Sequence, residues 1–427
     1  MSFASKKSSN IKKTLLGTTV AVGLALCNMP AQAAGFFLQE GSSSSAGASN
    51  AGAAAMPRDA SIIFHNPSAM TYLDGAQVNG AVHFLYTHAE LEDQASTVGT
   101  FPAAAVGLGD DGGNPGGLQP LPNLYGAAPI GMNGNLWAGI GVTTPFGLGP
   151  EYDEDFFGSF LVTQAELQVI DITPSLSYRV NDYLSVGISG IIQSSDLNYQ
   201  FFSALNEISR ITADDVAYGY KLSATLTPTD KITVGAQYRS RTNLDFEGDI
   251  DGGASLGVPA AGADASGTLN LPDMANLAVA YDWNDKWTIM GGLDWYGWGV
   301  TDTAFIDVTG PTPTLPVTFA YENTLNFNIG AEYRHSDKWT FRGGYQFDET
   351  PTTAEGRSAL NPDGDRHWFS GGATQTLNEK WSIDYAATYI DIEDGNINRD
   401  IAPGTSVVGQ ATDSYALIGT IGVNYKF

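Results

Sequence analysis

The chain has 427 residues, of which 43% are hydrophobic and 11% aromatic, and it contains 50 glycines. Its 46 acidic residues outnumber 20 basic ones and give a formal net charge of −26, which excludes a nucleic-acid-binding protein that relies on phosphate contacts. A single cysteine, Cys27, excludes a scaffold held together by disulfides.

The first 33 residues are typical of a cleavable secretion signal. They combine a lysine-rich start, an apolar run at residues 15–26 and a small-x-small cleavage site at Ala31-Gln32-Ala33. The apolar run is too short for a membrane-spanning helix, which needs roughly 20 residues. Cleavage after Ala33 removes Cys27 and four of the 20 basic residues, which leaves 16 basic against 46 acidic residues and a formal charge of −30. We therefore expect an exported protein without thiols or thiolate metal sites.

Residues 34–74 form a segment of small residues. Gly, Ser and Ala dominate it, and it ends in the run Asp59-Ala-Ser-Ile-Ile-Phe-His-Asn-Pro-Ser-Ala-Met70. No part of it alternates long enough to be a strand. A compact segment that directly precedes a large barrel is placed to fill the lumen. We expect a plug, or hatch, at residues 34–74 and a β-barrel at residues 75–427.

The remainder of the chain alternates between apolar and polar residues with a period of two. In the last segment, every second residue from Tyr415 to Phe427 is apolar or Gly, whereas Thr420 and Asn424 stand between them. The same period recurs at residues 184–193 and 325–334. Side chains alternate across a strand, so one face is expected to contact lipid and the other the lumen.

Short polar turns and long connections divide these strands. The short turns lie at residues 133–134, 181–182, 227–231, 284–286, 336–338 and 378–380, and four of them stand beside Tyr183, Trp287, Trp339 and Trp381. The long connections lie at about residues 92–120, 147–164, 197–214, 248–266, 303–318, 350–364 and 393–412. Six turns and seven loops require fourteen antiparallel strands. Aromatic residues beside the turns favour a barrel in the bacterial outer membrane over a soluble periplasmic β protein.

Several segments, taken in order, resemble the FadL family of outer-membrane transporters for long-chain fatty acids and other hydrophobic compounds. Those segments are Ala34-Gly-Phe-Phe-Leu-Gln-Glu40, the run that ends at Met70, Thr144-Pro-Phe-Gly-Leu148, Tyr238-Arg-Ser240, Leu269-Asn-Leu-Pro272, Arg342-Gly-Gly-Tyr-Gln-Phe-Asp-Glu-Thr-Pro351 and Pro362-Asp-Gly-Asp-Arg366. The family's Asn-Pro-Ala signature appears here with Ser68 in third place. The third outer segment, at about residues 196–215, is shorter than in the best-known members, which departs from their outer substrate groove.

The resemblance places the hatch signature opposite a kinked wall strand that leaves a lateral opening. Pro67 fixes φ and lacks an N–H, while Asn66 before it is extended and can bond nearby backbone. The expected gate residues are Phe64, His65, Asn66, Pro67 and Ser68. Gly139, Gly141 and Pro145 are expected to kink the strand at residues 135–146, because Gly and Pro weaken ladders. The alternative is a hatch that only prevents leakage.

Two groups of residues could recognise a hydrophobic substrate. Apolar side chains expected to capture it on the second and third loops are Phe156, Phe157, Phe160, Leu161, Phe201 and Phe202. Arginines expected to bind a carboxylate head group are Arg210, Arg239, Arg241 and Arg342. The alternatives are loops that pack together as a lid and lumen charges that neutralise one another.

Passive uptake of long-chain fatty acids or similar hydrophobic compounds is the leading functional expectation, with the hatch as gate. The alternatives are a hydrocarbon channel of the same family, a general hydrophilic porin and an outer-membrane lipid-modifying enzyme. No Gly-x-Ser-x-Gly elbow, paired-His spacing or ATPase motif appears, so we expect neither enzyme activity nor a cofactor or metal. The expected partners are the substrate, outer-membrane lipid and lipopolysaccharide, and the barrel assembly machinery. We expect a monomer.

Overall fold

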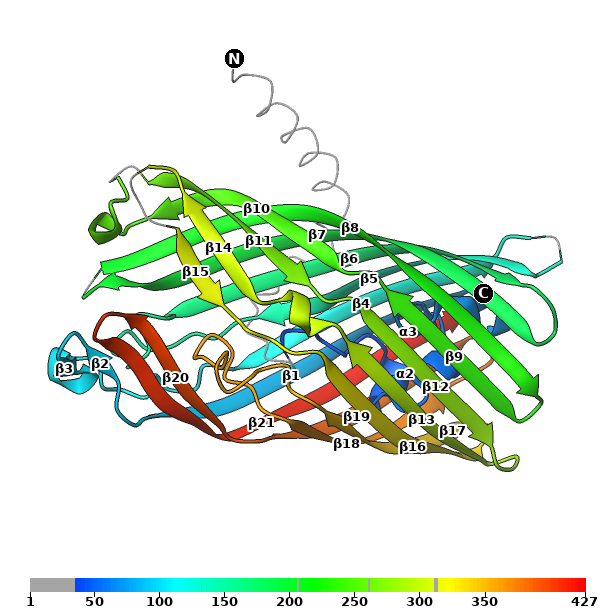
Figure 1. Ribbon diagram of the computed structural model, residues 1–427. Helices are drawn as coiled ribbons and strands as arrows, with labels where there is room; N and C mark the ends of the chain where they lie inside the picture. Colours follow the sequence, from blue (N-terminus) through cyan, green and yellow to red (C-terminus); the bar gives the residue numbers. More distant parts are fainter. Residues whose placement is uncertain (1–34, 132, 206, 260–261, 311–313) are drawn as a thin grey trace, which may run out of the picture.

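A closed antiparallel barrel of fourteen strands forms the wall of the protein, as expected from the sequence (Figure 1). The computed structural model describes residues 35–131, 133–205, 207–259, 262–310 and 314–427, so the expected secretion signal lies outside the described residues. The first strand, β1 (Gln77–Asp93), pairs with the last, β21 (Thr405–Lys426), and this pairing closes the cylinder.

The other twelve wall strands follow in chain order. Eight are single elements: β4 (Leu118–Pro129), β5 (Leu136–Leu148), β6 (Gln164–Arg179), β7 (Leu184–Ala204), β8 (Glu207–Thr229), β17 (Trp339–Asp348), β18 (Arg366–Thr376) and β19 (Trp381–Ile392). Four are interrupted midway: β9 (Ile232–Arg239) with β10 (Thr242–Asp251), β11 (Ala263–Leu271) with β12 (Met274–Asp282), β13 (Trp287–Tyr296) with β14 (Thr303–Val308), and β15 (Leu315–Thr318) with β16 (Thr324–Ser336). All six predicted short turns contain a chain reversal between two wall strands, although residues 227–229 belong to β8 and Ser336 belongs to β16.

Short elements occupy the connections at the other end. They are β2 (Thr97–Val98), β3 (Phe101–Pro102), η3 (Ala103–Val106), η4 (Ala254–Leu256) and β20 (Gly395–Ala402). A further short helix, η5 (Trp298–Val300), lies in the interruption between β13 and β14.

Three of the predicted long connections are wrong, because the chain continues there as paired strands. At residues 197–214, β7 and β8 remain paired up to Ala204 and Glu207. At residues 303–318, β14 and β15 pair from Thr303–Thr318 to Ile306–Leu315. At residues 393–412, β20 pairs with β21 from Gly395–Ala411 to Ala402–Thr405. The Gly and Asp content of these stretches lowers strand propensity, but a partner strand outweighs that preference. The third outer connection is therefore the tip of an extended hairpin.

The outward face of the wall is apolar, as a lipid-facing surface requires. Ile188, Leu222, Leu277, Leu293 and Phe327 lie on five different strands, and each side chain is about half exposed. The residues beside them in sequence are polar or small and point into the lumen, for example Ser189 and Asn328, which are buried.

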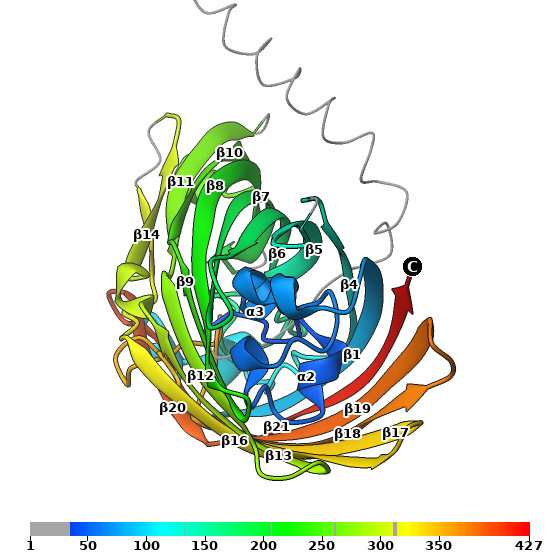
Figure 2. The ribbon, with the colours of Figure 1, turned by 90° about the vertical axis from the view of Figure 1, so that its right-hand side faces the viewer.

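Residues 35–73, named here the lumen segment, lie inside the barrel (Figure 2). The segment contains four short helices: α2 (Ser43–Ala46), η1 (Ala53–Ala55), α3 (Ile62–His65) and η2 (Pro67–Tyr72). Of the helices in the described parts of the chain, none is long and apolar enough to cross a membrane.

Glycines on both sides let the lumen segment approach the wall closely. A Cβ added to Gly372 of β18 would lie 2.7 Å from the Cα atom of Gly47, and one added to Gly187 of β7 would lie 2.6 Å from the backbone nitrogen of Ser68. Real side chains do not tolerate such distances, so larger residues at these wall positions would displace the segment. The small-residue composition of residues 34–74 thus has a packing role.

Candidate functional site

The Asn66-Pro67 turn is fixed to β8 by a buried hydrogen-bond cluster. The Asn66 amide donates to the backbone oxygen of Ala54 at 2.6 Å and to Oγ1 of Thr225 at 2.9 Å. Its oxygen accepts a bond of 2.6 Å from the Ser68 hydroxyl. Ser68 also binds Ser223 through its backbone N–H at 2.9 Å. Asn66 therefore joins two parts of the lumen segment to one wall strand.

The wall strand β5 changes its partner halfway along. β4 and β5 pair only up to Leu124 and Val142 in the described residues, and the register of β5 against β6 shifts between Thr143 and Phe146. From Pro145 to Gly147, β5 pairs with the start of the lumen segment in place of β4. Leu38 N–H donates to Pro145 O at 2.8 Å, and Gly147 N–H donates to Phe36 O at 3.0 Å. The β4–β5 ladder is thus interrupted where the lumen segment meets the wall.

The three candidate kink residues occupy different places. Pro145 lies within the register shift. Gly139 and Gly141 precede the register shift and pair regularly with β6. A Cβ at Gly139 would lie 2.5 Å from Sδ of Met70. These two glycines make room for the lumen segment, and the irregularity itself centres on Thr144-Pro145.

Two cavities lie on either side of an aromatic partition. Phe37 lines an inner cavity of about 40 Å³, and Phe36 lines an outer cavity of about 80 Å³. Phe36 packs edge-on against Trp298 at a ring separation of 4.9 Å, and Phe37 lies 5.3 Å from Tyr296. Phe146 of β5 contacts both phenylalanines. The first residues of the lumen segment therefore separate the two cavities.

The outer cavity is lined by apolar side chains from several wall strands. Leu148, Leu167, Leu197, Phe246 and Leu269 belong to its lining. Among the residues that the structure describes, no charged side chain borders it. Such a cavity suits a hydrocarbon body.

The inner cavity has charged groups. Arg239 in its lining forms an ion pair of 2.6 Å with the buried Asp171. Lys221 also lines it, and its Nζ atom donates a bond of 3.1 Å to the backbone oxygen of Phe64. Lys221 forms no ion pair with any residue that the structure describes. Asp294 faces the same cavity and accepts hydrogen bonds from Asn276 and Asn328.

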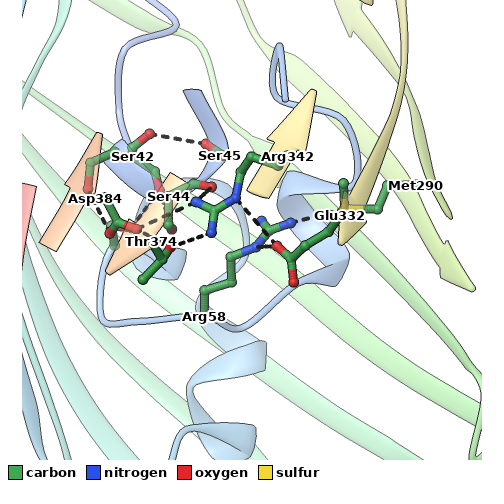
Figure 3. A network of polar contacts seen from close by, with 11 residues as sticks. Ser42, Ser44, Ser45, Arg58, Met290, Glu332, Arg342, Thr374 and Asp384 are labelled. Atoms are coloured by element: carbon green, nitrogen blue, oxygen red, sulfur yellow. Dashed lines mark hydrogen bonds and ion pairs between the residues drawn. The ribbon is translucent and has the colours of Figure 1, made fainter. Parts of the chain in front are cut away.

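Arg342 belongs to a network that anchors the lumen segment (Figure 3). Its guanidinium donates to Ser44 O at 2.8 Å and lies 3.5 Å from carboxylate oxygens of both Glu332 and Asp384. Arg58 of the lumen segment forms a second ion pair with Glu332 at 2.8 Å. The carboxylates of Glu332 and Asp384 are therefore already paired with arginines.

The other two candidate arginines lie outside the cavities. Arg241 is 56% exposed at its side chain and pairs with Asp273 at 3.3 Å. Arg210 is exposed on β8 and donates to Gln200. Of the four arginines, Arg239 alone lines one of these two cavities.

The predicted capture residues are not an exposed surface. Phe156 and Phe157 are buried, Phe160 and Leu161 are partly buried, and Phe201 and Phe202 are buried as well. Tyr152 stacks on Phe156 at 4.0 Å, and Phe160 packs against Phe202. The expectation of an exposed cluster is wrong, because the outer connections cover one another and remove these rings from water, as in the lid alternative.

Burial shifts two titratable groups of the lumen segment. Burial raises the pKa of Glu40 to about 7, and Arg366 opposes the shift only in part. The Glu40 Oε2 atom has no hydrogen-bond partner among the described residues. Burial, with the nearby charges of Lys221 and Arg58, lowers the pKa of His65 to about 3, so its imidazole is neutral at pH 7.

Sequence reasoning did not assign Phe36, Phe37, Tyr296 or Trp298 to the site. The Phe-Phe pair at the start of the hatch was a visible signal, since adjacent large rings are unusual in a segment of Gly, Ser and Ala. The position of Trp298 depends on the interruption between β13 and β14, for which the sequence carried no clear pattern.

A closed barrel with an apolar outer face, whose lumen holds a packed segment between two cavities, defines a plugged channel of the bacterial outer membrane. The chain belongs to the family described as outer membrane protein transport protein (OMPP1/FadL/TodX), whose family profile matches residues 24–427.

Relatives and solved structures agree with this assignment. The chain is 26% identical to the long-chain fatty acid transport protein of Escherichia coli strain K12, over 91% of this chain and 95% of the relative. It is 26% identical to outer membrane protein P1 of Haemophilus influenzae, over 87% of this chain and 89% of the relative. The crystal structure of a Pseudomonas aeruginosa FadL homologue superposes with a TM-score of 0.85 at 25% identity, covering 92% of this chain and 100% of that one. The Pseudomonas putida toluene transporter TodX shares the fold, with a TM-score of 0.66 at 16% identity over 92% and 99% of the two chains.

Proposed function

We propose that this protein is a passive channel for long-chain fatty acids and similar hydrophobic compounds, with the lumen segment as its gate. The observation that carries the proposal is the pair of cavities separated by Phe36 and Phe37, beside the interrupted β4–β5 ladder. A substrate that moves from the outer to the inner cavity must displace this partition. Because the same residues replace β4 as the partner of β5, their displacement also frees the wall at that point.

Lys221 is the residue that we propose for the carboxylate head group. The candidate arginines Arg239 and Arg342 are already paired with acids, whereas Lys221 donates to a carbonyl oxygen and forms no ion pair within the described ranges. A substrate carboxylate in the inner cavity would form an ion pair with the Lys221 ammonium group, in place of the present bond to an uncharged carbonyl oxygen.

A hydrocarbon channel is the second candidate. It is supported by the outer cavity, whose lining contains no charged side chain. A neutral compound would use this cavity without needing Lys221. Binding of oleate and of a neutral alkane to the same protein therefore separates the two functions.

We further propose that the protein works as a channel and not as an enzyme. The long-chain fatty acid transport protein named among its relatives supports this choice. Lipid hydrolysis by the purified barrel would contradict it. The roles of lipopolysaccharide and of the assembly machinery, and the monomeric state, stay predictions that cross-linking and native mass measurements can test.

Deletion of residues 34–70 tests the gate and the porin alternative together. The lumen segment packs tightly against the wall, so its removal should open a water-filled pore and raise ion conductance in planar bilayers. A general porin would conduct before the deletion and change little after it. Absence of any conductance increase on deletion would contradict a gating role for this segment.

A further inference from the structure

The barrel wall is also interrupted far from β5 along the sequence. β11 and β14 pair only through residues 265–267 and 306–308, and the next pair between these wall strands is Met274 with Tyr296. Side-chain bonds close the lower part of this interval, since Thr301 Oγ1 donates to Asn270 O at 2.6 Å. Among the described residues, residues 268–269 of β11 and residues 304–305 of β14 face each other without backbone ladder pairs.

The outer cavity lies directly behind this interruption. Leu269 and Ala304 line the cavity from its two sides, and both remain partly exposed although their strand positions face inward. Phe305 also borders the cavity and is 54% exposed. The cavity is therefore bounded by partly exposed side chains at this point of the wall.

The interruption lies at the edge of the lipid-facing band that is farther from the short turns. On the side nearer the short turns, Tyr238 of β9 and Trp295 of β13 occupy outward positions. Leu293, the next outward residue of β13 toward its short turn, is 48% exposed. Tyr and Trp mark the membrane–water interface in such barrels. Farther from the short turns, on β10 and β11, the outward positions carry polar residues such as Asp245, Asp249 and Asp264.

We propose that the interruption between β11 and β14 is a lateral portal, through which alkyl chains of amphiphiles in the outer leaflet reach the outer cavity. This inference rests on the function proposed above. The cavity has no charged lining, so the apolar chain enters it and the carboxylate stays in water, where ionic groups are least costly. Unpaired strand backbone is tolerated at this level because water reaches the interface, whereas it would be costly within hydrocarbon.

A single engineered cysteine tests the portal, because the expected mature chain has no thiol of its own. Ala304→Cys places a thiol at the portal, and Asp307→Cys places one on the opposite, exposed face of the same strand. Intact cells that carry each variant are treated with a bulky N-alkyl maleimide, labelling is quantified by mass spectrometry, and oleate uptake is measured before and after. Leu148→Cys, at the β5 side of the cavity, reports whether the reagent enters elsewhere.

We expect Ala304→Cys to label faster than Leu148→Cys and to lose at least about tenfold in oleate uptake after labelling, while labelled Asp307→Cys retains its uptake. Ala304→Trp, which needs no reagent, should show the same loss with a folded barrel. Slow labelling of Ala304→Cys, or unchanged uptake after full labelling, would overturn the portal and leave the transport function intact. Failure of the unlabelled protein to take up oleate would instead contradict the proposed function.

Discussion

The ammonium group of Lys221 donates a 3.1 Å hydrogen bond to the backbone oxygen of Phe64 and lies 5.2 Å from the centre of that ring. A cation of the wall thus holds the residue that precedes His65 and the Asn66-Pro67 turn. A carboxylate that enters the inner cavity would compete with this carbonyl oxygen. Substrate binding and the position of the lumen segment would then depend on the same side chain.

Lys221→Met should weaken oleate binding about tenfold or more, since a bond to a charged group contributes roughly 1.5–3 kcal/mol. Binding of a neutral alkane should change little. Isothermal titration of the detergent-solubilised protein with both ligands measures the difference. Lys338→Met, in the short turn between β16 and β17, serves as the charge-matched control. Equal losses for oleate and alkane would remove Lys221 from the head-group site.

Asn66→Ala should loosen the lumen segment, because it removes the buried donor to the Ala54 carbonyl and one of the two partners of the Ser68 hydroxyl. The expected cost is about 2 kcal/mol in the stability of that region. Hydrogen exchange of residues 60–72 should speed up while the wall strands stay protected. The exposed Asn396→Ala provides a control that removes the same side chain from β20. Unchanged exchange in Asn66→Ala would show that the cluster does not hold the turn.

Gly372→Val should displace the lumen segment, because its Cβ would lie 2.7 Å from the Cα atom of Gly47. Bilayer conductance should rise toward that of the protein lacking residues 34–70. The neighbouring Gly371→Val is a close control, since a Cβ there meets no heavy atom within 4 Å. If both variants conduct equally, the close packing at Gly47 is not what seals the lumen.

Glu40 should make the lumen segment less stable as the pH rises. Its pKa is about 7 in the folded protein against an ordinary value of 4.5, so the folded state holds the proton more tightly. Its contribution is complete below about pH 4.5 and is lost between about pH 4.5 and 7, with a magnitude on the order of 3 kcal/mol. Glu40→Gln should abolish this dependence. Protease cleavage within residues 35–73, compared at pH 5 and pH 8 in both proteins, measures it, and the same pH response in Glu40→Gln would contradict the assignment.

The wall could be predicted from the sequence because alternation and turns are local signals. The six short turns were predicted from small clusters of polar turn residues, four of them beside an aromatic residue, and the strands between them followed. The hairpin of β7 and β8 was missed, since its Asp and Asn residues resemble a loop until a partner strand is known.

The site was less predictable because it depends on which charges meet across the lumen. The sequence marked Arg239 and Arg342 as candidates for a carboxylate, but it could not show that Asp171 and Asp384 pair with them. Lys221 differs from these arginines in forming no ion pair within the described part of the chain, which becomes visible only once the pairs of Arg239 and Arg342 are known. The buried positions of Phe156 and Phe202 likewise follow from contacts between connections that are distant in sequence.

Uptake of radiolabelled oleate by intact cells tests passive transport through the lumen most directly. The cells should lack their own long-chain fatty acid transport protein and carry this protein, its Lys221→Met variant or neither. We predict that the protein restores uptake and that Lys221→Met lowers it, while both proteins reach the outer membrane in equal amounts. Oleate uptake no greater than in cells without the protein, together with free passage of small sugars, would contradict the proposed function.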